Sequence, residues 1–116
     1  MDIITFREFC LSLHAVTEGL PFGKDVLVFK VKGKMFCLTG IDDFAYINLK
    51  CDPDKALLLR EKYPAVTPGY HMNKKHWNSV QMDGSVADEL IRAWIKDSYN
   101  LVVAGLPKKD QQEFRE

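Results

Sequence analysis

Three short strand-like segments follow one another in residues 25–50, and only short turns connect them. In the first, Asp25–Lys32, successive side chains would point to opposite faces of a sheet. The dipeptide Lys32-Gly33 fits a two-residue hairpin turn, since glycine readily takes a positive φ. A second turn at Gly40–Asp43 leads into Phe44–Lys50. Turns this short cannot join parallel strands, which need a crossover of a dozen or more residues, so an antiparallel sheet is predicted.

The hairpin turn also predicts a register. Counting outward from it places Phe29 opposite Phe36 and Leu27 opposite Leu38, so two apolar pairs share the face that helices should cover. The less apolar face carries Lys30, Cys37, Tyr46, Asn48 and Lys50. Such a face can line a ligand pocket. It can equally be half solvated, as is common in antiparallel sheets, and the sequence leaves both readings open.

Helices are predicted before and after these strands. Thr5 and Glu8 are spaced as a capping box at the start of the first helix. Asp52-Pro53 reads as an N-cap followed by proline at the first helical position, and the second helix should end before Pro64.

A third, longer helix is expected after Ser85 and Asp88, which resemble another capping pair, and it should stop at Gly105. A short strand before Pro68 and a strand at His76–Met82 separate the last two helices. The resulting order is α-β(3)-α-β(2)-α, an α+β fold with an antiparallel sheet and helices packed on one face.

The length of 116 residues predicts a single domain spanning 1–116, whose charged tail, residues 108–116, is helical or frayed. Three cysteines, an odd number without CxxC spacing, indicate free thiols in a reducing cytosol. No segment reads as a signal peptide or a membrane span, so we expect a cytoplasmic protein, without membrane contact and monomeric.

The formal net charge is zero, so no global electrostatic attraction to nucleic acid is expected. The charge is nevertheless uneven: residues 21–82 hold ten Lys and Arg against six Asp and Glu, a surplus of four. A nucleic-acid site would therefore be a local feature of the middle of the chain.

Five segments together resemble the MmcQ/YjbR-like family: TEGLPFG at 17–23, FKVKGKMFCL at 29–38, INLKCDP at 47–53, TPGYHMNKKHWNSV at 67–80 and DSYNLVVAGLP at 97–107. The resemblance implies an α-β(3)-α-β(2)-α fold similar to secretion-chaperone-like domains. It also implies DNA binding through a wing-like arrangement of strands and loops. It brings no reaction, cofactor or catalytic residue with it.

The segment 71–77 is the densest candidate for nucleic-acid contact. Lysines can neutralise phosphates, histidine and asparagine can donate hydrogen bonds, and tryptophan can stack on a base. The candidate residues are His71, Asn73, Lys74, Lys75, His76 and Trp77. The simpler alternative is that the two lysines solvate a loop while Trp77 packs in the core.

A second basic group, Lys30, Lys32 and Lys34, straddles the first hairpin. A hairpin with a basic tip could lie as a wing against a phosphate backbone. Lysines at strand edges and tips also deter aggregation between sheets, and that reading is favoured here.

No catalytic motif or metal-ligand spacing is found, so we expect no enzymatic activity, no cofactor and no metal. The leading hypothesis is a DNA-binding domain. The alternatives are a protein-interaction module, by analogy with secretion chaperones, and a small-molecule-binding domain.

Overall fold

A computed structural model describes residues 1–69 and 72–115. Its elements are α1 (Ile3–Ser12), β1 (Val16–Gly19), β2 (Val26–Val31), β3 (Lys34–Gly40), β4 (Tyr46–Lys50), α2 (Pro53–Lys62), β5 (Val66–Pro68), β6 (Trp77–Gln81), α3 (Asp88–Ala104), α4 (Lys108–Gln111) and a 3-10 turn, η1 (Gln112–Phe114). No helix in the described ranges is long and apolar enough to cross a membrane.

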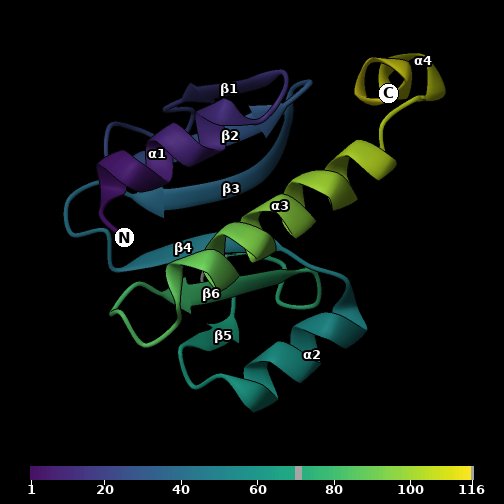
Figure 1. Ribbon diagram of the computed structural model, residues 1–116. Coiled ribbons are helices and arrows are strands. Elements are labelled where there is room, and N and C mark those ends of the chain that lie inside the picture. Colours follow the sequence, from purple (N-terminus) through teal and green to yellow (C-terminus); the bar gives the residue numbers. More distant parts are fainter. Residues whose placement is uncertain (70–71, 116) are drawn as a thin grey trace.

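The six strands form one antiparallel sheet in the order β1-β2-β3-β4-β6-β5. Helices α1 and α3 lie across one face of it (Figure 1), and α2 packs beside α3 through an edge-to-face contact of Tyr63 with Trp94. We call the opposite face the open face. The predicted α+β class with an antiparallel sheet is confirmed.

The strand count of the predicted order is wrong, because four strands, not three, precede α2. The additional strand is β1, in a segment where the sequence predicted no strand. It has only four residues, and it pairs with β2 after a sharp reversal at Ala15, whose φ is 60°. A strand this short at a sheet edge exists through its partner, and no local pattern marks it.

The predicted helix starts are partly corrected. Helix α1 begins three residues early, because Asp2 is the N-cap and its Oδ1 accepts from Thr5 N at 2.8 Å. Helix α3 begins after Ala87 with no side-chain cap. Helix α2 matches its prediction: Asp52 is the N-cap, and its Oδ2 accepts from Lys55 N at 3.2 Å.

The predicted β2–β3 register holds only beside the turn. Val31 pairs with Lys34 and Lys30 with Met35, but Phe29 pairs with Cys37, because a bulge inserts Phe36 as an extra residue. The bulge turns both Phe36 and Cys37 toward the helices, where each is fully buried. The prediction that Cys37 lies on the less apolar face is therefore wrong.

Ser98 of α3 completes the hydrogen bonding that the bulge disrupts. Its hydroxyl donates to Phe36 O at 2.6 Å and accepts from Lys50 N at 2.9 Å. A regular β3–β4 ladder would continue beyond the Cys37–Leu49 pair into these two backbone groups. A buried side chain from the helix thus satisfies both groups.

The core has two parts. The larger part lies between the sheet and the helices, and it contains Phe6, Phe29, Phe36 and Ile95, all fully buried. Cys10 and Cys37 are in contact there, and burial raises the pKa of the Cys37 thiol. The smaller part lies on the open face and consists of Val28, Leu38 and Trp77, with Val26, Met35 and Met72 packed around them.

Candidate functional site

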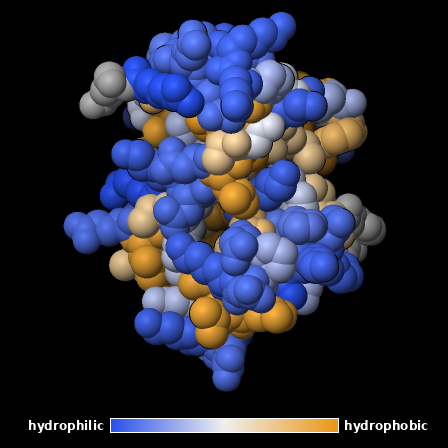
Figure 2. All heavy atoms as spheres, turned by 90° about the vertical axis from the view of Figure 1, so that its right-hand side faces the viewer, coloured by the Kyte–Doolittle hydropathy of each residue, from blue (hydrophilic) through white to orange (hydrophobic). Residues whose placement is uncertain are grey.

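The two predicted basic groups meet at one end of the sheet. The β2–β3 turn, the end of β4 at Lys50 and the start of β6 at Trp77 all lie there, because β4 runs antiparallel to both β3 and β6. Figure 2 looks onto this side of the molecule, where hydrophilic residues predominate and hydrophobic ones appear in separate patches. We call it the basic end.

On the open face, Lys30 and Lys50 stand at the basic end. Lys30 is paired with Met35 and Lys50 with Trp77, and residues directly opposed on antiparallel strands share a face. The exposed Lys74 and Lys75 belong to the loop that leads into β6. No described carboxylate forms an ion pair with these four lysines.

The loop before β6 is a compact turn. Asn73 Oδ1 accepts from Lys75 N at 2.9 Å, and Asn73 O accepts from His76 N and Trp77 N. His76 O accepts from Cys51 N at 2.7 Å, which ties the loop to the end of β4. Asn73 and His76 therefore have structural roles here, and His71 lies outside the described residues.

Arg60 of α2 binds the same loop through hydrogen bonds. Its guanidinium donates to Asn78 Oδ1 at 2.7 Å, to Trp77 O at 3.3 Å and to Lys74 O. Because these acceptors belong to the loop and to the first residues of β6, Arg60 fixes where the backbone of Lys74 lies.

Gly69 allows the loop to approach β6 closely. A Cβ at this position would lie 2.7 Å from Trp77 Cβ, closer than real Cβ atoms come to other heavy atoms, and 3.0 Å from Met72 Cβ, which is an unusually tight contact. Trp77 itself is only 8% exposed and packs on Val28 and Leu38. Trp77 therefore packs in the core, as the simpler alternative for this residue predicted.

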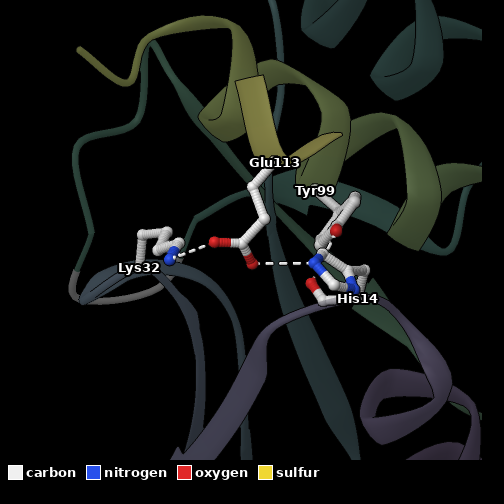
Figure 3. A network of polar contacts seen from close by, with 4 residues as sticks. All are labelled: His14, Lys32, Tyr99 and Glu113. Atoms are coloured by element: carbon white, nitrogen blue, oxygen red, sulfur yellow. Dashed lines mark hydrogen bonds and ion pairs between the residues drawn. The ribbon is translucent and has the colours of Figure 1, made fainter. Parts of the chain in front are cut away.

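The three hairpin lysines are separated by the structure. Lys32 occupies the turn and forms an ion pair with Glu113 of η1, with Nζ and Oε1 2.5 Å apart (Figure 3). His14 Nε2 lies 2.7 Å from Glu113 Oε2, and Tyr99 Oη donates to His14 O at 2.7 Å. Lys34 is exposed and is paired with Val31, a residue of the helix-side core.

The charged groups in this network shift the pKa values of their partners. Hydrogen bonds from Lys32 and His14 lower the pKa of the Glu113 carboxyl, and the hydrogen bond to Glu113 raises the pKa of Lys32. Lys32 is therefore already neutralised by the C-terminal tail, and of the hairpin lysines only Lys30 stands on the open face.

The open face is hollowed into a groove with a volume of about 860 Å³, which extends from the Leu38–Asn48–Ser79 row toward the β3–β4 turn. Its walls include Phe22, Tyr46 and Met72, and its floor includes Leu38, Asn48 and Ser79. Phe22 is 64% exposed and Tyr46 46% exposed. Ser79 Oγ donates to Asn48 Oδ1 at 2.5 Å. In the described ranges, no three His, Cys, Asp or Glu side chains gather as metal ligands.

The YjbR family model matches residues 11–101, which extend from the last two residues of α1 through most of α3. This chain belongs to the YjbR family. The uncharacterized protein YbdF of Escherichia coli O157:H7 is 46% identical over 112 residues, covering 96% of this chain and 92% of that protein. The uncharacterized protein YjbR of Escherichia coli K12 is 27% identical, covering 97% and 96%.

Solved structures of similar proteins have the same YjbR-like fold. A crystal structure of a Deinococcus radiodurans protein with a DUF419 domain superposes with a TM-score of 0.89 at 39% identity, covering 96% of this chain and 86% of that one. A Pseudomonas syringae protein superposes with a TM-score of 0.74 at 29% identity, covering 87% and 98%. The names of these relatives state no ligand or reaction.

Several groove residues of this YjbR-family chain escaped the sequence reasoning. Tyr46, Asn48 and Lys50 were placed on the less apolar face, but Phe22 and Ser79 were not singled out. Phe22 belongs to a loop, where no periodicity applies. The closeness of Ser79 to Asn48 depends on the β4–β6 pairing, which joins segments 31 residues apart.

Proposed function

We propose that this protein is a cytoplasmic DNA-binding domain without catalytic activity, formed by residues 1–116 as one unit. The observation that carries the proposal is the set of four lysines at the basic end: Lys30, Lys50, Lys74 and Lys75. None of them forms an ion pair with a described carboxylate, so their charges are available to phosphates.

The charge on the open face is polarised. Asp42 and Asp43 lie in the turn between β3 and β4, at the end of the sheet opposite the lysines. A phosphate backbone would therefore be attracted to one end of the face and repelled from the other. This local polarity supports binding even though the net charge of the chain is zero.

The test is a titration of labelled DNA by fluorescence anisotropy across a range of salt concentrations. Replacing Lys74 and Lys75 with alanine should remove about two phosphate contacts and flatten the slope of log K against log salt by roughly 0.9 for each. The loop backbone should survive, because Arg60 and Asn73 hold it through backbone groups and the Asn73 amide.

The matched control is Lys108→Ala with Lys109→Ala. These two lysines are also adjacent and exposed, and they lie on α4, away from the open face. The double control makes the same change in net charge and should leave the slope close to that of the wild type. Absence of binding at low salt, or equal slopes for both double variants, would retire the proposal.

A protein-interaction module is the second candidate, because Leu57 and Leu58 of α2 are 59% and 64% exposed. Adjacent exposed leucines on one helix are suited to an apolar groove on a partner. Affinity capture with the wild type and with the Leu57→Ser, Leu58→Ser variant tests this. A partner that both forms retain equally would not be held by this helix.

A further inference from the structure

The groove and the basic end are continuous on the open face. One cross-strand row of the groove floor contains Leu38, Asn48 and Ser79, paired in that order. Lys50 stands two residues beyond Asn48 on β4, which is about 7 Å along a strand. Lys30 stands two residues beyond Val28, the partner of Leu38. A ligand lying along the face would therefore meet the groove and the lysines together.

We propose that the groove receives an unstacked base of single-stranded DNA whose phosphates lie on the lysines of the basic end. The inference rests on the proposed function and narrows it from DNA in general to single strands. It assigns the ligand class from the shape of the groove, from its aromatic walls and from the polarity of its surroundings.

The aromatic walls are suited to stacking. Phe22 and Tyr46 line the groove, and they are 64% and 46% exposed in the folded protein, so both rings are accessible to a ligand. Aromatic side chains near basic residues are the usual platform for the bases of single strands, since every base has a π face. The buried Trp77 does not serve this purpose, because it is packed against Val28 and Leu38.

The floor offers a hydrogen-bond donor to the edge of a base. Asn48 Oδ1 is occupied by the Ser79 hydroxyl, whereas the Asn48 amide NH₂ donates to no described group. Asparagine amides commonly donate to the acceptors on base edges. The groove therefore combines stacking walls with a donor at its floor, next to a source of positive charge.

The polarity of the groove orients the ligand. Asp43 lines the rim away from the lysines, so a phosphate is disfavoured there and favoured beside Lys30 and Lys50. A duplex keeps its bases stacked inside, and extruding one costs a few kcal/mol, so a concave site for a base selects single strands.

The experiment compares three labelled probes of equal length by anisotropy: an oligodeoxythymidine strand, a duplex, and an abasic sugar–phosphate strand. The single strand should bind about 5- to 100-fold more tightly than the abasic strand, which carries the same charge but has nothing to stack. Tyr46→Ala should reduce single-strand affinity by a similar factor, and Tyr46→Phe should retain it. Ile4→Ala, which trims a side chain of α1 that is 67% exposed, is the matched control and should change nothing.

Each outcome decides the matter. If Tyr46→Ala lowers the melting temperature strongly, Phe22→Ala replaces it, because Phe22 lies in an exposed loop outside the sheet. Equal binding of the single strand, the abasic strand and the duplex, with the slope flattened in the Lys74, Lys75 variant, overturns the base-binding groove and keeps the proposed function. Failure of the wild type to bind any of the three probes overturns both.

Discussion

At the scale of single residues, the small side chain of Ser98 should contribute strongly to the free energy of unfolding. Ser98→Ala would leave Phe36 O and Lys50 N without their partner inside the core. Leaving buried polar groups unsatisfied costs about 1–3 kcal/mol each, so urea denaturation should show a decrease in the free energy of unfolding of at least that order. Ser12→Ala, whose exposed hydroxyl donates to Phe9 O, is the control and should stay within about 0.5 kcal/mol of the wild type.

Gly69 offers a second residue-scale prediction, at the basic end. Gly69→Ala places a methyl group 2.7 Å from Trp77 Cβ, so the loop or β6 must shift. Overpacking of this kind typically costs about 1–3 kcal/mol. Thermal unfolding should show the loss, and Gly19→Ala, where a Cβ would meet nothing within 4 Å, is the comparison. An unchanged melting temperature for Gly69→Ala would contradict the close approach.

At the scale of elements, the bulge in β3 decides which side chains reach the helices. Phe36 is fully buried and meets Tyr99 of α3 edge-to-face, with ring centroids 5.5 Å apart. Phe36→Ala should lower the free energy of unfolding by about 3–5 kcal/mol, as large aromatic truncations in cores do. Phe22→Ala removes the same ring from a site that is 64% exposed and should have little effect on stability. Similar losses for the two variants would refute the assignment of Phe36 to the core.

At the scale of the whole molecule, Glu113 links the C-terminal tail to both the β2–β3 turn and the segment after α1. Its carboxyl pKa is lowered by Lys32 and His14. Because the folded pKa is depressed, the stabilising contribution of these contacts is present above the unfolded pKa. It should be lost as the pH falls through the lowered folded pKa, below the ordinary glutamate range.

The measurement is an acid titration followed by the NMR signals of Phe114, which contacts the rings of His14 and Tyr99. These signals should move as Glu113 is protonated, and Glu113→Gln should abolish that step. Asp83 also has a lowered carboxyl pKa, through hydrogen bonds with Ser85, far along the chain from this network. Asp83→Asn is therefore the control that should leave the Phe114 titration unchanged.

The sequence by itself determined the features that local chemistry specifies: the Lys32-Gly33 turn, the Asp52-Pro53 helix start and the antiparallel strands of residues 26–50. These depend on positive φ, capping and alternation, all of which act over a few residues. Even the basic segments were visible along the chain, although not their meeting at one end of the sheet.

Tertiary structure alone decided the rest. The edge strand β1 exists through its pairing with β2, and the bulge at Phe36 is stabilised by Ser98, 62 residues further along the chain. The neutralisation of Lys32 by Glu113 and the groove around Asn48 likewise join segments distant in sequence. Such features depend on packing and hydrogen bonds between elements, and no local propensity records them.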